Sequence, residues 1–155
     1  MNVDIRVQQA DFSHEQEVTG LRARGGEIGA IVTFTGLVRD LDSGSSVRGL
    51  YLEHYPGMTE KSLRGIVTQA GERWPLLSVT VIHRVGELHA AEQIVFVGVS
   101  TAHRHDAFAA CEFIMDFLKT RAPFWKKSLQ ADGEHWVEAK DSDTAASDRW
   151  QSGTP

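Results

Sequence analysis

The stretch Ile94-Val-Phe-Val-Gly-Val99 is a short, apolar, β-branched run, and the longest helical pattern of the chain follows it closely. From about Arg104 to Lys119, apolar residues recur every three or four positions, which is typical of a helix with one buried face. Pro123 prevents a clean continuation of that helix. A buried strand followed by an amphipathic helix indicates a domain that mixes both kinds of element.

Strand-like and helix-like patterns also alternate before and after this stretch. Ser13 and Gln16 have the spacing of a capping box, which predicts a short helix after Ser13. A second helix is expected up to Trp74, and residues 42–46 have the composition of a loop. Further strands are predicted at residues 3–7, 29–36, 47–54, 79–85 and 136–140. This order predicts an α+β fold with a largely antiparallel sheet and two main helices.

The length and composition limit the possible classes of protein. The 155 residues are 41% hydrophobic and 24% charged, as expected for a soluble globular domain. We expect one domain over residues 1–140 and a loosely held polar tail over residues 141–155, in which Trp150 alone is large enough to dock. No targeting or membrane-spanning stretch is visible, so a cytoplasmic protein that does not contact membranes is predicted.

The charges are distributed unevenly along the chain. The acidic net charge of −5 argues against a general nucleic-acid binder. Four cations lie within nine residues that contain no acid, so the rest of the chain carries −5 − 4 = −9; they are Lys119, Arg121, Lys126 and Lys127. A cationic helix end alone would be a common solvated feature. Here Pro123, Phe124 and Trp125 are interleaved with the cations, which indicates the wall of a pocket.

Two other cationic positions qualify as anion contacts. His103 and Arg104 fall at the expected start of the long helix, where free N–H groups favour a phosphate, although His103 alone would more often be a capping or surface residue. Arg39 follows a strand and a glycine turn, and a loop arginine paired with Asp40 or Asp42 is an equally good interpretation. His103 and His105 do not form a ligand set, so no metal site is expected.

Several conspicuous residues are better explained by packing. Cys111 and Met115 lie on the apolar stripe of the long helix, although Met115 shares a helix face with Lys119. The cluster Glu53-His54-Tyr55 lies in a predicted strand, where neighbours point to opposite faces, so Glu53 and His54 cannot cooperate simply. The residues alone indicate one cationic, aromatic-lined site for a small anionic molecule.

Five stretches carry a resemblance to the catalytic (large) subunit family of molybdopterin synthase. They lie between about Ile28 and Lys140, and the last of them is long and specific. They are Phe34-Thr-Gly-Leu-Val-Arg39, Leu52-Glu-His-Tyr-Pro-Gly-Met-Thr-Glu60, Val81-Ile-His-Arg-Val-Gly-Glu87, Ile94-Val-Phe-Val-Gly-Val99 and Phe113-Ile-Met-Asp-Phe-Leu-Lys-Thr-Arg-Ala-Pro-Phe-Trp-Lys126.

The resemblance implies a fold, a reaction and partners. The expected fold is an α/β hammerhead-type domain with an additional antiparallel β subdomain. The expected reaction transfers sulfur to cyclic pyranopterin monophosphate and forms the dithiolene of molybdopterin. The sulfur arrives as a thiocarboxylate on the C-terminal glycine of a small, ubiquitin-like subunit. Two large subunits are expected to form a homodimer within a heterotetramer, and no cofactor of the enzyme's own is implied.

The resemblance also implies roles for individual residues. Lys119 and Lys126 correspond to the essential lysines of the family, and Arg39, His103 and Arg104 to its phosphate contacts. The remaining implied positions are substrate-binding Leu37, Val38, Lys127 and Ser128, pocket-lining Phe34 and Met115, and Lys140, which would reach the neighbouring subunit's site. Leu37 stands where relatives can have lysine, so only its backbone is expected to contribute.

Two other functions remain as alternatives. The chain could be a non-catalytic adaptor that grips a ubiquitin-like tail, in which case it should not bind the pterin precursor. It could also be a hydrolase or transferase of another small phosphate ester, which would act without a sulfur-carrying partner.

Overall fold

A four-stranded sheet forms the centre of the protein. The computed structural model describes residues 1–39, 47–130, 133–137 and 141–151. The central sheet has the order β1-β4-β6-β2. Its strands are β1 (Asn2–Gln8), β4 (Leu76–Arg84), β6 (Gln93–Thr101) and β2 (Ala30–Leu37). The pairs β4–β6 and β6–β2 are antiparallel, whereas β1 and β4 run parallel.

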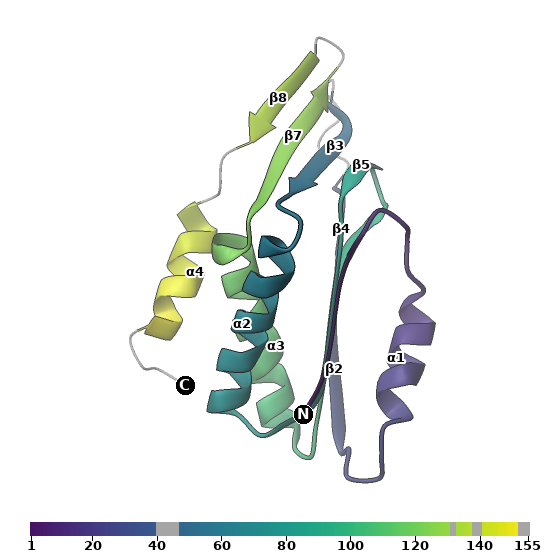
Figure 1. Cartoon of the computed structure of the whole chain (residues 1–155), viewed down its shortest axis with the longest axis vertical. Coiled ribbons are helices and arrows are strands. Elements are labelled where there is room, and N and C mark those ends of the chain that lie inside the picture. The colour runs from purple at the N-terminus through teal and green to yellow at the C-terminus, as the bar shows by residue number, and fades with distance from the viewer. Residues whose placement is uncertain (40–46, 131–132, 138–140, 152–155) are drawn as a thin grey trace.

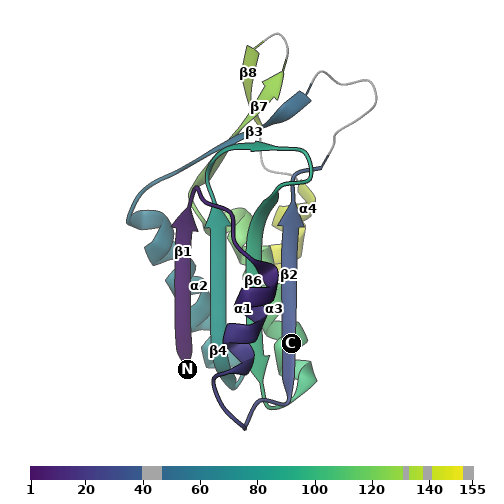
Figure 2. The same cartoon turned by 90° about the vertical axis from the view of Figure 1, so that its right-hand side faces the viewer.

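Helices cover both faces of this sheet (Figure 2). α2 (Met58–Arg73) and α3 (Arg104–Arg121) pack on one face over the largest apolar cluster, which includes Val81 and Val97. The shorter α1 (His14–Arg22) covers the other face, where Leu21 packs with Phe96. Since β4 and β6 are buried on both faces, their sequences are nearly continuous apolar runs.

The expected local signals shape the ends of these helices. The side chain of Ser13 accepts a hydrogen bond from the backbone N–H of Gln16, so the predicted cap of α1 is confirmed. α2 begins after Gly57, whose φ of 85° favours glycine, and whose N–H donates to Glu60. α3 ends just before Pro123, as predicted.

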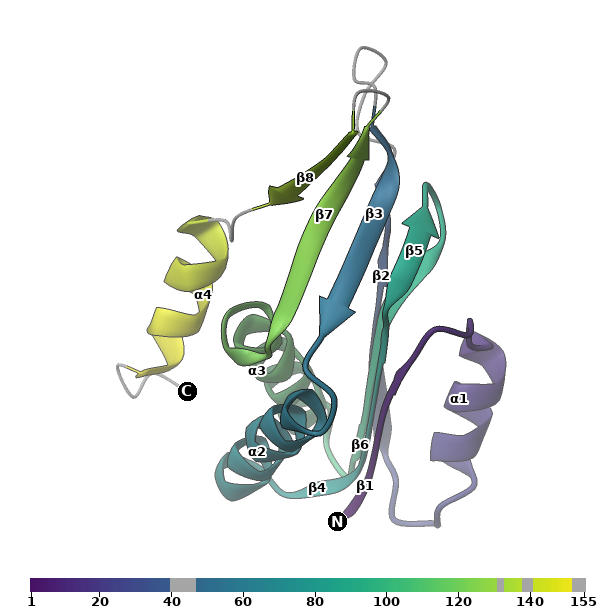
Figure 3. The same cartoon turned by 45° about the horizontal axis from the view of Figure 1, so that its top comes forward.

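A second, antiparallel sheet projects beyond the first (Figures 1 and 3). Its order is β5-β3-β7-β8. Its strands are β5 (Gly86–His89), β3 (Val47–His54), β7 (Phe124–Gln130) and β8 (Gly133–Val137). The α+β class and the additional antiparallel subdomain are therefore confirmed. The periodicity did not predict β5 or β7, which form by pairing with β3.

The tail differs from its predicted character where the structure describes it. Instead of a loosely held segment, α4 (Asp141–Gln151) forms a helix that packs against α3. Trp150 is buried between Trp74 and Phe113, and its indole Nε1–H donates to Asp116 at 2.6 Å. The loop predicted at residues 42–46 lies outside the described residues. No helix within the described ranges is long and apolar enough to cross a membrane.

Candidate functional site

The two predicted lysines lie on different elements that meet at one end of the central sheet. Lys119 is exposed in the last turn of α3, and Lys126 is half-buried as the third residue of β7. The cations at the end of α3 also interact favourably with the helix dipole. The turn of residues 122–123 joins the two elements. The cationic stretch singled out in the sequence therefore spans the end of α3, the turn and the start of β7. We call residues 119–126 the corner.

Alternation along β7 decides which neighbours Lys126 has. Phe124 and Lys126 lie on one face of the strand, whereas Trp125 lies on the other and is 47% exposed. Phe124 packs against the main core, and it pairs in register with His54 of β3. Glu53 pairs with Trp125 instead, so Glu53 and His54 point to opposite faces, as expected.

A buried histidine lies beneath this corner. His83 of β4 is 6% exposed, and its ring stacks on Phe124 with a centroid distance of 3.7 Å and an interplanar angle of 19°. Burial and, to a smaller extent, the charges of Lys119, Lys126 and His54 together lower the pKa of His83 to about 3, against the opposing effect of its hydrogen bond to the Arg84 carbonyl. Both lysines thus lie within electrostatic reach of one neutral imidazole.

Arg39 lies at the same end of the central sheet as the two lysines. β2 ends at Leu37, which pairs with Gln93 at the start of β6. Val38 is buried in a small apolar cluster with Leu52 and Leu88. The backbone of Val38 donates to the carbonyl of Glu92 and accepts from the N–H of Ala91, both at 2.9 Å. Val38 thus anchors the strand end, and its exposed neighbours Leu37 and Arg39 face outward.

Phe34 and Met115 lie on the side of the sheet that α3 covers. Phe34 is 40% exposed and follows Val32 at a spacing of two, on the face that packs on α3. A Cβ on Gly36 would lie 3.3 Å from the Phe34 ring and 2.7 Å from Val95, so only glycine leaves room for this ring. Met115 is buried one turn before Lys119.

His103 and Arg104 lie at the opposite end of α3. His103 is the exposed N-cap residue and Arg104 the first helical residue. The fifteen residue steps from Arg104 to Lys119 correspond to about 22 Å of helix. Within one chain, these two residues therefore cannot contact the same small molecule as Lys119.

Three predicted positions are described only in part or not at all. Lys127 and Ser128 are placed by register in β7, opposite Tyr51 and Leu50. Their side chains, and the whole of Lys140, lie outside the described part of the structure.

Other candidate chemistries find little support in the described residues. Burial, with a smaller contribution from the charge of Glu112, raises the pKa of the Cys111 thiol to about 12. A thiol of this kind is a poor nucleophile. Across residues 1–39, 47–130, 133–137 and 141–151, no group of three His, Cys, Asp or Glu side chains could hold a metal ion.

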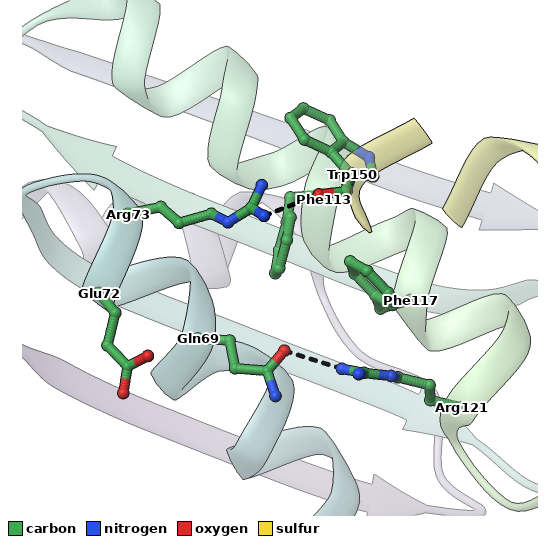
Figure 4. A pocket seen from close by; sticks show the side chains of 7 residues that line it. All are labelled: Gln69, Glu72, Arg73, Phe113, Phe117, Arg121 and Trp150. Atoms are coloured by element: carbon green, nitrogen blue, oxygen red, sulfur yellow. Dashed lines mark hydrogen bonds between the residues drawn. The ribbon is translucent and has the colours of Figure 1, made fainter. Parts of the chain in front are cut away.

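A separate pocket of about 340 Å³ lies between α2, α3 and α4 (Figure 4). Its walls are formed by Gln69, Glu72, Arg73, Phe113, Phe117, Arg121 and Trp150. Arg73 donates to the backbone carbonyl of Trp150 at 2.8 Å, and Arg121 donates to Gln69 at 2.8 Å (Figure 4). Because both guanidinium groups serve contacts between helices, we interpret this pocket as part of the packing of α4.

Two residues that contact the corner were not identified from the sequence. Thr59 of α2 is fully buried and donates to the carbonyl of Pro123 at 3.2 Å. For His83, the sequence pattern predicts only a position in a strand. The signal for His83 is a titratable residue within the apolar run Val79–Val85, because such residues are rarely buried without a specific partner.

The arrangement favours the binding of anions. Lys119, Lys126 and Arg39 lie at one end of the sheet, and Phe124 lies on the same face of β7 as Lys126, with its ring stacked on His83. Cations gathered at one end of a sheet can bind a phosphate or carboxylate and can stabilise negative charge that develops during a reaction.

Comparison with known proteins identifies the family. The profile of the MoaE protein family matches residues 7–121. A molybdopterin synthase catalytic subunit from Vibrio cholerae is 58% identical over 97% of this chain and 100% of the relative. The solved structure of a molybdopterin biosynthesis MoaE protein from Burkholderia ambifaria has a TM-score of 0.84 and 52% identity, with 100% of both chains covered. A molybdopterin synthase structure from Staphylococcus aureus has a TM-score of 0.78 at 32% identity, covering 85% of this chain and 95% of that one. The chain therefore belongs to the MoaE protein family.

Proposed function

We propose that this chain is the catalytic subunit of molybdopterin synthase. In this reaction, sulfur passes from the C-terminal thiocarboxylate of a small, ubiquitin-like subunit to cyclic pyranopterin monophosphate, and the dithiolene of molybdopterin forms. The observation that carries the proposal is the corner at the end of α3, where Lys119 and Lys126 meet around His83. The high identity to catalytic subunits over nearly the whole chain supports it.

The lysines carry the chemistry in this proposal. Each transfer forms a C–S bond on the pterin, where an oxygen is lost, and breaks the C–S bond of the thiocarboxylate. Water supplies the oxygen that replaces sulfur on the acyl carbon, so the tail leaves as a carboxylate. Negative charge develops on the acyl oxygen as the water adds. Lys119 acts as general acid/base or electrostatic stabiliser at this step. Lys126 assists proton transfer and orients the substrate. Phe34 and Met115 line the substrate pocket that the family resemblance implies.

We further propose that two copies of the chain complete each site. Arg39 lies at the lysine end of the sheet, whereas His103 and Arg104 lie about 22 Å away along α3. If all three contact the phosphate, as the family resemblance implies, His103 and Arg104 must come from the second copy. A homodimer with two such sites satisfies this condition, because a two-fold axis presents the same surfaces reciprocally.

The partners follow from the same chemistry. The homodimer binds one small sulfur-carrier subunit at each site, which gives a heterotetramer. Neither nucleic acid nor a membrane takes part. Cys111 is not the sulfur carrier, because its thiol is buried and the sulfur enters on the tail of the partner. A buried free thiol suits a reducing compartment, and we place the protein in the cytoplasm.

Substitution of Lys119 by alanine tests this function. The variant is incubated anaerobically with cyclic pyranopterin monophosphate and the thiocarboxylated small subunit. Loss of a general acid/base should lower the rate of molybdopterin formation by about 100-fold or more. Arg22→Ala is the matched control, because Arg22 is an exposed cation on α1, on the opposite face of the sheet. A near-normal rate for Lys119→Ala contradicts the assignment.

The two alternative functions, an adaptor and a phosphate-ester hydrolase or transferase, predict different results with the same proteins and pterin precursor. An adaptor would bind the small subunit without binding the pterin precursor, as calorimetric titration would show. A hydrolase or transferase of phosphate esters would act on the precursor when the small subunit is absent.

A further inference from the structure

The geometry between the two lysines depends on a very short connection. α3 ends at Arg121, β7 begins at Phe124, and the backbone N–H of Phe124 donates to the carbonyl of Ala122 at 2.9 Å. Lys119 lies on the helix side of this turn and Lys126 on the strand side. Any change in the turn would therefore move one lysine relative to the other.

Thr59 fixes the turn from the side of α2. Its hydroxyl donates to the carbonyl of Pro123 at 3.2 Å and accepts from the N–H of Tyr55 at 3.0 Å. The N–H of Thr59 also donates to the carbonyl of Tyr55 at 2.9 Å. With 0% of its surface exposed, Thr59 holds the turn through hydrogen bonds that are shielded from water.

His83 fixes the turn from the side of the central sheet. Its Nδ1 lies 2.8 Å from the carbonyl of Arg84, which can only accept, so Nδ1 carries the proton and donates. The Arg84 side chain is itself bound to the carbonyls of Gln9 and Gln93. The imidazole is thus held in one orientation, and Phe124 stacks on it at 3.7 Å.

We propose that His83 and Thr59 are positioning residues for sulfur transfer. They need not touch the substrate: His83 acts through Phe124, and Thr59 through Pro123. Together they tie the start of β7 to the rigid central sheet and to α2, so that Lys126 keeps its place relative to Lys119. This inference rests on the proposed function, because it assigns these lysines to the reaction.

Matched substitutions of Thr59 give the first test. Thr59→Val keeps the shape of the side chain but removes both hydroxyl hydrogen bonds, whereas Thr59→Ser keeps the hydroxyl. Thr80→Val is the control, since Thr80 is a buried threonine of β4 that lies two residues before Ile82 and therefore on the α1 face. Steady-state kinetics are measured on the whole complex with the thiocarboxylated small subunit.

The expected result is a change in kcat rather than in KM. Thr59→Val should lower kcat by about 10- to 100-fold, because a displacement near 1 Å can cost that much in an oriented reaction. Its KM for cyclic pyranopterin monophosphate should stay within about 3-fold, and Thr59→Ser should restore most of kcat. Wild-type kcat in a folded Thr59→Val variant overturns the proposal, as does an equal loss in Thr59→Ser.

Substitution of His83 provides a second, independent measurement. His83→Leu removes the flat ring, whereas His83→Phe keeps a ring that can stack on Phe124. The lysines are labelled with acetic anhydride, and mass spectrometry compares Lys119 and Lys126 with Lys61 on α2. Because the reactivity of an amine follows its surroundings, His83→Leu should change the ratio of Lys126 to Lys119 labelling by more than about 2-fold, and His83→Phe should change it less.

These measurements distinguish the positioning role of His83 and Thr59 from the proposed function in sulfur transfer. The labelling ratio does not require turnover, so it tests the positioning role even if the wild-type protein forms no molybdopterin. An unchanged ratio in both His83 variants overturns the positioning role and leaves the proposed function intact. If His83→Leu does not fold, the Thr59→Val and Thr59→Ser pair decides alone.

Discussion

The neutral, buried state of His83 makes a quantitative prediction for acid stability. In the unfolded chain, a histidine binds a proton below a pKa of about 6.5. In the folded protein, burial and then the nearby Lys119, Lys126 and His54 lower the pKa of His83 to about 3. Between these values the unfolded state binds the proton and the folded state does not, so stability falls as the pH falls.

The magnitude follows from the two pKa values. Moving from pH 7 to pH 4.5 should cost the folded state about 2.5 kcal/mol through this one residue. His83→Phe lacks the titrating group but keeps a ring beside Phe124. The difference in unfolding free energy between wild type and His83→Phe should therefore shift by about 2.5 kcal/mol in favour of the variant at the lower pH.

Urea unfolding at fixed protein concentration measures this shift. The fluorescence of the buried Trp74 and Trp150 reports the transition. The difference in unfolding free energy between the two proteins at one pH cancels the contribution of the other titrating groups. The change in this difference between pH 7 and pH 4.5 cancels the pH-independent effect of the substitution. Parallel stability curves for the two proteins between pH 7 and pH 4.5 would refute the claim that His83 is buried in its neutral form.

Three further predictions concern packing, the pocket wall and the shared site. Trp150→Ala should lower the free energy of unfolding by about 3 kcal/mol, because a buried aromatic side chain is lost; an unchanged urea midpoint would show that α4 does not contribute to stability. Gly36→Ala should displace the Phe34 ring and raise the KM for the pterin by about 3-fold or more with little change in fold by circular dichroism; an unchanged KM would remove Phe34 from the pocket wall. Inactive Lys119→Ala and Arg104→Ala proteins, unfolded and refolded together, should regain about one quarter of the wild-type rate, because half of the dimers are mixed and each mixed dimer has one intact site. No recovery on mixing would place both residues in the site of a single chain.

Local signals in the sequence predicted most of the fold. The Ser13 cap, the apolar spacing of α2 and α3 and the β-branched runs of β2 and β6 all act within a few residues. The parallel pairing of β1 with β4 and the formation of β7 depend on partners more than 60 residues away. In β7, the two lysines and a tryptophan obscure any alternation of polar and apolar residues, so no strand was predicted there.

The candidate site was predictable to a similar extent. The unusual mixture of cations and aromatics is visible in the sequence itself, and it singles out Lys119 and Lys126. Thr59 could not be found in this way, because its partner Pro123 lies 64 residues further along the chain. The separation of Arg104 from Lys119 follows from the length of the predicted helix. The position of Arg39 at the lysine end needed the structure, because it depends on the antiparallel pairing of β2 with β6.

The transfer of sulfur is the central claim, and isotope labelling tests it most directly. The small subunit is prepared with a ³⁴S-labelled thiocarboxylate and incubated with this protein and cyclic pyranopterin monophosphate. Mass spectrometry of the pterin should show a product that carries two ³⁴S atoms, formed only when this protein is present. A pterin that gains no labelled sulfur, or gains it equally without this protein, would contradict the account.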